Sequence, residues 1–175
     1  MSGLRGFLLP ALVLLLAALC LAPSPVHADD PQVTRSRVEA AYLFKFADFV
    51  SWPEKSFASE SSPIVVAVVA DEELARDLEL AATGKQVQGR PMRVRHVDAG
   101  ELLPDSHVLF IGAAARDQAP ALLDDIRGRP VLTVSNDPGV HAQGTMVNFV
   151  VVDQRVRFDV ALRRAQEGSL RISAL

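Results

Sequence analysis

The stretch from Pro130 to Phe158, PVLTVSNDPGVHAQGTMVNFVVVDQRVRF, carries the strongest indications of fold and function in this sequence. It begins with the apolar run Val131–Val134, whose β-branched residues suit a strand buried on both faces. The next segment, Ser135–Gly139, gathers serine, asparagine, aspartate, proline and glycine, which predict an exposed loop. Because loops beyond the carboxyl ends of parallel strands commonly carry binding residues, we expect the working surface of the protein here.

The second half of this stretch predicts an antiparallel hairpin. Thr145–Val152 is mostly apolar and β-branched, as expected of a strand. The short polar dipeptide Asp153-Gln154 then connects it to a second strand, Arg155–Phe158. A short helix, Val160–Glu167, is expected to follow.

Further strands and helices are predicted upstream. Ile64–Ala70 and His107–Gly112 are apolar runs typical of central strands. Asp71 predicts a helix N-cap directly after the first run, and Arg116–Arg127 has the apolar spacing of another helix. Met92–Val97 alternates apolar and basic residues, which favours a strand near an edge of the sheet.

The order of these elements predicts a single α/β domain. A strand that leads directly into a capped helix is half of a βαβ unit, and such units build parallel sheets with helices on both faces. We therefore expect a mostly parallel sheet that is covered on both faces and finished by a C-terminal antiparallel hairpin.

An aromatic-rich helix is predicted from Arg37 to Trp52, where Pro53 disfavours a helical residue before it. Its apolar stripe, with spacings of three and four, comprises Val38, Ala41, Tyr42, Phe46, Phe49 and Val50. One interpretation is that the aromatic side chains fill the core against the sheet. The other is that Trp52, and Phe44 outside the stripe, line a pocket or an exposed surface for a partner.

The N-terminal segment Met1–Ala28 has the pattern of a secretory signal peptide. Arg5 precedes an apolar core, Phe7–Leu21, and Val26-His27-Ala28 is a small-residue cleavage site. Cleavage after Ala28 would leave the domain Asp29–Leu175.

Removal of this segment would change the composition of the chain. The 18 basic residues would fall to 17 against 21 acidic ones, a net charge of −4, which does not favour nucleic-acid binding. Cys20 is the only cysteine, so the exported chain would have no disulfide and would depend on its core for stability. The polar segment Asp29–Ser36 is expected to be a loose leader.

Signatures of catalysis and of cofactor binding are missing from the sequence. Gly84-Lys85-Gln86 lacks the upstream glycine and the Ser/Thr of a phosphate-binding loop. Ser135 has no Gly-x-Ser-x-Gly context, and His96, His107 and His141 are not spaced as zinc ligands on one element. We therefore expect no enzyme activity, no cofactor and no metal. A hydrolase would require a histidine within hydrogen-bond reach of Ser135.

A binding function remains. The late loops could form a crevice edged by Thr133, Ser135, Asp137 and Asn148. Equally, the small polar residues of this region could serve only to turn the chain.

Several segments, in this order, resemble the YfiR family of exported bacterial proteins. They are VEAAYLFKFADFVSWP at Val38–Pro53, GKQVQGRPMRV at Gly84–Val94, SHVLFIG at Ser106–Gly112, VLTVSNDPGVHAQGTMVNFV at Val131–Val150 and RVRFDVALRRAQEGSLRIS at Arg155–Ser173. Their combination, rather than any single piece, carries the resemblance.

The resemblance implies a periplasmic α/β protein that represses an inner-membrane diguanylate cyclase of the YfiN type. Repression would come from binding the periplasmic sensor domain of the cyclase, and it would lower cyclic di-GMP and disfavour biofilm formation. Positions that match the family signature are candidates for contacts with a partner or ligand. They are Phe46, Phe49, Trp52, Pro53, Thr133, Ser135, Asp137, Gly144, Met146 and Phe158, to which the residue pattern adds Phe44.

The alternative function is a periplasmic small-molecule-binding module that feeds another envelope receptor, such as a sensor kinase. A homodimer is expected by default, since symmetric dimers are common. Ser106 stands where the family pattern has a cysteine, so we do not expect regulation of this chain by a disulfide.

Overall fold

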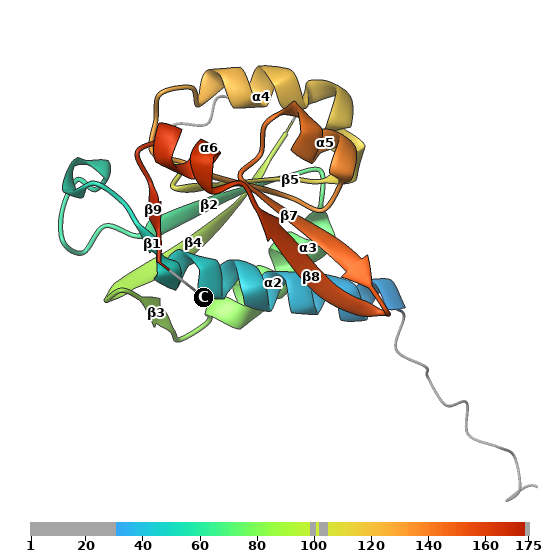
Figure 1. The fold of residues 1–175 in the computed structure, drawn as a ribbon. Helices are drawn as coiled ribbons and strands as arrows, with labels where there is room; N and C mark the ends of the chain where they lie inside the picture. The colour runs from blue at the N-terminus through green and yellow to red at the C-terminus, as the bar shows by residue number, and fades with distance from the viewer. Residues whose placement is uncertain (1–30, 99–100, 102–104, 174–175) are drawn as a thin grey trace, which may run out of the picture.

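The computed structural model describes residues 31–98, 101 and 105–173. The predicted signal peptide, Met1–Ala28, lies outside these residues. The described chain forms a seven-stranded sheet between two layers of helices, with a small two-stranded sheet beside it (Figure 1).

The centre of the large sheet consists of the three strands that the apolar runs predicted. β2 (Ile64–Val69), β5 (Val108–Ile111) and β6 (Leu132–Ser135) are parallel and buried along their whole length. Because side chains on a strand point alternately to its two faces, β2 and β5 contribute to an apolar core on both sides of the sheet. β6 contributes Leu132 and Val134 to one of these cores, and its other two residues are the buried polar Thr133 and Ser135.

The strand order of the large sheet is β3-β4-β2-β5-β6-β7-β8. β4 (Arg90–Val97) and β7 (Val147–Val152) run parallel to their inner neighbours. β3 (Gln86–Val87) and β8 (Arg155–Val160) are antiparallel strands at the two edges. The predicted C-terminal hairpin is confirmed, and so is the place of Met92–Val97 near an edge, since only the two-residue β3 lies beyond β4.

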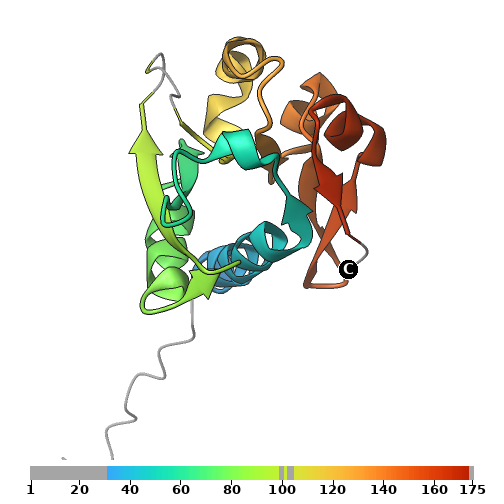
Figure 2. The same ribbon diagram turned by 90° about the vertical axis from the view of Figure 1, so that its left-hand side faces the viewer.

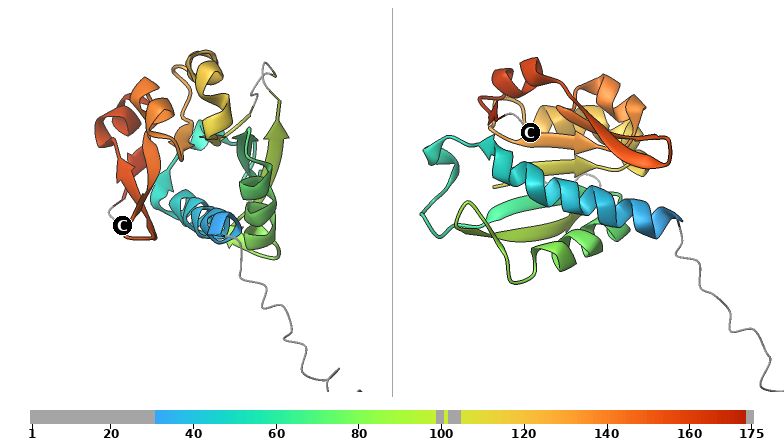
Figure 3. Two further views of the ribbon diagram at one scale, coloured as in Figure 1. Left: turned by 90° about the vertical axis from the view of Figure 1, so that its right-hand side faces the viewer. Right: turned by 60° about the horizontal axis from the view of Figure 1, so that its bottom comes forward.

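Helices cover both faces of this sheet, which confirms the predicted fold class (Figure 1). One face is covered by two helices, α2 (Pro31–Phe49) and α3 (Glu72–Ala82). Figure 3 shows the longer of the two, α2, running across the sheet. Three shorter helices pack on the other face, η2 (Ala113–Gln118), α4 (Ala119–Asp125) and α5 (Pro138–Gln143).

The C-terminal segment returns to the end of α2. After β8 the chain forms α6 (Leu162–Glu167) and then β9 (Arg171–Ile172), which pairs antiparallel with β1 (Val50–Ser51) in the small sheet (Figure 2). The backbone N–H and the Oγ of Ser173 both donate to the Phe49 carbonyl, each at 2.9 Å. The small sheet therefore fastens the last described residues to the first helix.

The first helix begins earlier and buries a different face than the sequence predicted. α2 starts at Pro31, so the predicted leader is helical, and it ends at Phe49 rather than at Trp52. Ala41 is exposed and Tyr42 is only half-buried. The residues that α2 buries are Ser36, Glu39, Ala40, Leu43, Phe46 and Ala47. The prediction missed this face because it contains two polar residues, which burial tolerates only when they have hydrogen-bond partners.

The segment Ser135–Gly139 is not the exposed loop that its composition predicted. Ser135 and Asp137 are buried, and the chain enters α5 at Pro138. Asp137 caps this helix, because its carboxylate accepts the N–H of Val140 at 2.9 Å. A short capped helix thus takes the place of an open loop.

Candidate functional site

A cluster of polar side chains lies at the carboxyl edge of the sheet. Asp71 follows β2, Asn136 follows β6, and Glu39 comes from α2. The side-chain amide of Asn136 donates to Glu39 Oε2 at 3.1 Å and to Asp71 Oδ2 at 3.3 Å. Arg35 donates from Nε to Glu39 Oε1 at 2.6 Å and from Nη2 to the Asn136 carbonyl at 3.2 Å. These four residues are called the Glu39 cluster below.

Glu39 is the most buried member of the cluster, at 1% exposed. Burial raises the pKa of its carboxyl, because the charged form loses hydration, while the hydrogen bond and the positive charge of Arg35 act in the opposite direction. Asn136 Oδ1 is buried and accepts no hydrogen bond from the described residues. The cluster therefore combines a buried acid, a partly exposed guanidinium and a carbonyl oxygen that could accept a hydrogen bond from a bound molecule.

The four residues of the predicted crevice lie near one another, but they are buried and do not line an open crevice. Thr133, Ser135, Asp137 and Asn148 are each at most 6% exposed. Ser135 Oγ donates toward Asn148 Oδ1 at 2.9 Å and the Asp137 carbonyl at 3.1 Å. The backbone N–H of Met146 donates to Thr133 Oγ1 at 2.9 Å and to the Thr133 carbonyl at 3.0 Å. The contacts of Ser135 and Thr133 join β6 to β7 and to Met146, directly before β7.

Asp137 links this group to the solvent-facing side of the molecule. Its Oδ1 accepts Arg116 Nε at 3.0 Å, and Arg116 Nη2 pairs with Oδ2. The hydrogen bond from Arg116 holds the pKa of the Asp137 carboxyl below its ordinary value. Because the Arg116 side chain is 53% exposed, it presents a fixed positive charge at this edge.

Two glycines shape the same edge. Gly144 ends α5 with a φ of 139°, in a region that favours glycine. Gly112 ends β5 so close to β2 that a Cβ would lie 2.5 Å from the carbonyl oxygen of Ala70. The strand order reverses between β2 and β5, where doubly wound sheets usually open a ligand crevice. The approach of Gly112 to Ala70 brings the two backbones together at this point.

The aromatic residues of α2 pack beneath the C-terminal hairpin. The ring centroid of Phe46 lies 4.8 Å from that of Phe158 and 5.6 Å from that of Phe149. The Tyr42 ring lies 5.5 Å from Phe158. Phe46 is buried and Phe158 is half-buried, so the core interpretation is confirmed for Phe46.

Trp52 and Pro53 lie at the opposite, amino edge of the sheet. The indole N–H of Trp52 donates to the carbonyl of His107, directly before β5, at 3.3 Å. Pro53 precedes a short 3₁₀ helix, η1 (Glu54–Ser56). His107 is buried and is held from both sides: Nδ1 accepts the N–H of Val65 at 3.1 Å, and Nε2 lies 3.0 Å from the Ser56 carbonyl.

A stack of side chains completes this edge. The rings of His107 and Phe57 are nearly parallel with centroids 4.5 Å apart, and the Arg90 guanidinium lies 3.8 Å from the centroid of Phe57. Burial lowers the pKa of His107, with the charge of Arg90 acting in the same direction. His107 therefore holds the serine-rich loop after Trp52, Lys55–Pro63, against the sheet.

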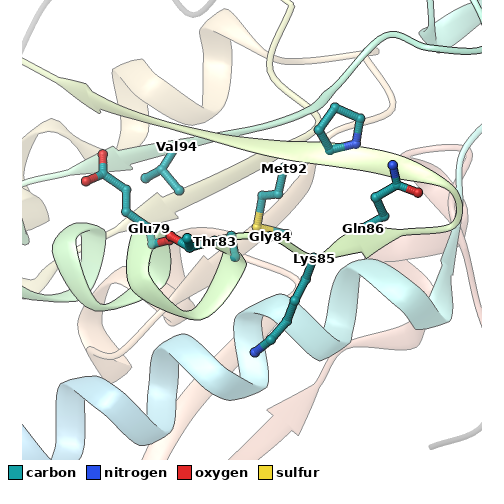
Figure 4. A pocket seen from close by; sticks show the side chains of 9 residues that line it. Glu79, Thr83, Gly84, Lys85, Gln86, Met92 and Val94 are labelled. Atoms are coloured by element: carbon teal, nitrogen blue, oxygen red, sulfur yellow. The ribbon is translucent and has the colours of Figure 1, made fainter.

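A surface groove of about 460 Å³ lies between α3 and β4 (Figure 4). Met92 and Val94 contribute apolar lining, while Glu79 and Lys85 bring charges of opposite sign to it. Figure 4 shows Lys85 extending toward α2, where its Nζ lies 5.6 Å from the centroid of the Phe44 ring. No local sequence pattern connects Lys85 with Phe44, which lies 41 positions earlier.

The candidate residues from the sequence therefore divide among separate places. The late residues lie together at the carboxyl edge: Thr133, Ser135, Asp137, Gly144 and Met146. The aromatic residues are not brought to them, since Trp52 lies at the amino edge and Phe46 in the core. Asn136 lies within the segment that the sequence marked as the working surface, whereas sequence reasoning did not select Arg35, Glu39, Arg116 and His107 as site residues. Glu39 had a detectable signal, because it lies in helical register with the apolar Leu43 and Phe46.

The described residues show no arrangement for hydrolysis, metal binding or membrane insertion. The described hydrogen bonds of the Ser135 hydroxyl involve Asn148 and Asp137, and none joins it to a histidine. No group of three histidine, cysteine, aspartate or glutamate residues is arranged to hold a metal ion within residues 31–98, 101 and 105–173. In the same ranges, no helix has the length and apolarity needed to span a bilayer.

The protein therefore has a doubly wound α/β fold. The polar residues at the carboxyl ends of its strands are mostly hydrogen-bonded to other residues of the protein. A family model described as YfiR/HmsC-like (DUF4154) matches residues 36–175. The chain belongs to the YfiR/HmsC-like family, which confirms the resemblance found in its sequence segments. This family is regulatory and non-catalytic, and its members are periplasmic regulators of diguanylate cyclase signalling.

Proposed function

We propose that this protein binds the periplasmic sensor domain of an inner-membrane diguanylate cyclase and holds that enzyme inactive, so that cyclic di-GMP falls. Family membership over residues 36–175 is the observation that carries this proposal. The predicted signal peptide, Met1–Ala28, would deliver the domain to the compartment in which such a sensor domain is accessible.

Repression of this kind is a population shift. The repressor would bind the inactive conformation of the sensor more tightly than the active one, and the difference in binding free energy would set the equilibrium. Moving a sensor from 99% active to 99% inactive requires a difference of about 5.5 kcal/mol. A signal that weakens the complex would restore cyclase activity.

The carboxyl edge of the sheet is the contact surface that we propose. Arg116 presents a positive charge fixed by Asp137, and Arg35 lies partly exposed beside Asn136. Polar groups positioned by a rigid sheet edge are typical of binding sites in doubly wound folds. The buried candidates Thr133 and Ser135 would support this surface without touching the partner.

The binding test uses co-purification. The exported protein should co-purify with the periplasmic domain of a membrane diguanylate cyclase encoded beside it, and deletion of its gene should raise cellular cyclic di-GMP. Absence of both a complex and a rise in cyclic di-GMP would remove the proposal.

The surface test uses a charge reversal with a matched control. Arg116→Glu should weaken the complex by about tenfold or more, since it places a negative charge at the contact. Arg127→Glu reverses an exposed arginine beyond the end of α4, away from the carboxyl edge, and should leave the affinity unchanged. Equal affinities for both variants would move the contact away from the carboxyl edge while leaving the repressor function in place.

A second candidate function, a small-molecule-binding module for an envelope receptor such as a sensor kinase, is favoured by the groove between α3 and β4. Apolar lining beside Lys85 suits an aromatic carboxylate. A panel of such compounds should raise the melting temperature of the protein, Lys85→Ala should abolish the rise, and Lys55→Ala on η1 should keep it. No shift with any compound of the panel would argue against this function.

A further inference from the structure

The last strand of the large sheet has an open edge. β8 pairs only with β7 among the described residues, and it lies at the outer end of the strand order (Figures 1 and 3). Its burial alternates: Val156, Phe158 and Val160 are half-buried on the side of the α2 core, while the charged residues between them are exposed. Such an edge is a template for pairing with another strand.

The direction of the backbone groups on this edge follows from the hairpin. Asp153 and Gln154 have φ values of 49° and 59°, as the central residues of a two-residue type I′ hairpin require. Val152 and Arg155 are then a hydrogen-bonded pair, and alternation makes Arg157 and Asp159 bond toward β7. The N–H of Ala161, which donates to the Met146 carbonyl at 2.7 Å, fits this alternation.

The N–H and C=O groups of Val156, Phe158 and Val160 consequently point outward, away from β7. In the described part of the chain, none of these three residues makes a backbone hydrogen bond to a further strand. The edge therefore offers three consecutive outward-facing residues, which matches the requirement of one more antiparallel strand.

The sequence of β8, Arg-Val-Arg-Phe-Asp-Val, is complementary to itself in one antiparallel register. When Phe158 faces Phe158 of a second copy, Val156 faces Val160 and Arg157 faces Asp159, each pair occurring twice. Opposite charges on directly facing residues stabilise a strand pair, and like charges destabilise it. A parallel in-register arrangement would place Arg157 opposite Arg157, and an antiparallel one shifted by two residues would place either Arg157 opposite Arg157 or Asp159 opposite Asp159. No salt bridge of the described residues involves Arg157 or Asp159, so both are free to form these pairs.

We propose that two copies of this chain associate through their β8 strands, antiparallel and centred on Phe158, so that the two sheets become continuous. The charge pairs between Arg157 and Asp159 of the second copy select this register. The inference does not depend on the proposed cyclase partner, because it concerns the protein alone.

The first experiment measures association of the purified periplasmic product of the full chain by analytical ultracentrifugation. A reversible dimer is expected at concentrations up to about 100 µM, since a small interface gives weak association. Arg157→Asp and Asp159→Arg should each raise the dimer dissociation constant by about tenfold, because each replaces two attractive pairs by two repulsive ones. The double variant Arg157→Asp/Asp159→Arg should restore dimerisation.

The control variant is Arg155→Asp. In the proposed register Arg155 faces no residue of β8 in the second copy, so the dissociation constant should not change. In the shifted register that places Arg157 opposite Arg157, Arg155 would face Asp159, and this variant would then weaken the dimer. Circular dichroism of each variant verifies that the fold is retained.

A second experiment tests the register by cross-linking. Facing residues in a non-hydrogen-bonded pair have Cα atoms about 4.5 Å apart, within the range that a disulfide spans. A mixture of Arg157→Cys and Asp159→Cys chains should form a disulfide-linked dimer under mild oxidation, whereas either variant alone should not. The proposal would be overturned by a strictly monomeric protein or by a dimer whose dissociation constant does not respond to the charge reversals. It would also be overturned if β8 bound a different protein in place of a second copy.

Discussion

At the scale of single residues, the buried carboxyl of Glu39 has the clearest consequence for stability. Burial raises its pKa in the folded state, so the folded chain holds the proton to a higher pH than the unfolded chain. Its contribution to stability is therefore complete below the ordinary pKa of a glutamate. That contribution is lost as the pH rises through the raised value.

We predict that Glu39→Gln removes this pH dependence. Glutamine keeps the shape of the protonated side chain and cannot ionise, so the variant should gain stability relative to the wild-type protein as the pH rises from about 4 to about 7. Thermal denaturation across this range measures the difference. Glu60→Gln in the exposed serine-rich loop serves as the control for loss of one negative charge. A constant difference in melting temperature between Glu39→Gln and the wild-type protein would contradict the prediction.

At the scale of elements, the strands followed from the sequence more reliably than the loops and the first helix. The runs that became β2, β5 and β6 are apolar because both faces of each strand are buried, and that burial leaves a direct trace in composition. The helix α5 left no comparable trace. Its six residues begin with Pro138-Gly139, and its N-cap depends on Asp137, whose pairing with Arg116 joins distant positions.

Gly112 tests how tightly the elements meet at the point where the strand order reverses. Gly112→Ala should lower the free energy of unfolding by about 1–3 kcal/mol, because the added Cβ would meet the backbone of Ala70 and the strands β2 and β5 would have to separate. Gly168→Ala is the matched control, since its Cβ would meet the mobile end of the Met146 side chain. Urea denaturation measures both, and equal losses would contradict the close-approach argument.

At the scale of the whole molecule, the fold class was predictable and the assembly of the site was not. Alternation of buried strands and helices is sufficient to indicate a parallel sheet with two covered faces. The Glu39 cluster joins Arg35 and Glu39 to Asn136 over sequence separations of 101 and 97 residues, and no local pattern indicates contacts at such separations. The same holds for the hydrogen bonds that connect His107 with Trp52 and with Ser56 in the serine-rich loop.

The return of the C-terminal segment to α2 gives a prediction at this scale. Leu170 is 1% exposed in the main core, next to β9, so Leu170→Ala should cost about 2–5 kcal/mol of unfolding free energy. Leu162→Ala changes the same residue type where it is 56% exposed, and it should cost at most about 0.5 kcal/mol. Denaturant titration of the two variants measures the difference. Similar costs would mean that the C-terminal segment packs independently of the core.

The contact between Trp52 and His107 makes the chain its own optical reporter. Trp52 is the only tryptophan, and its half-buried indole is hydrogen-bonded at the amino edge of the sheet and flanked by Phe57. Emission excited at the red edge of the aromatic band thus comes from one fluorophore at one place. Any event that releases the serine-rich loop from His107 will hydrate that indole and move its emission to longer wavelength, without a dye or an engineered label.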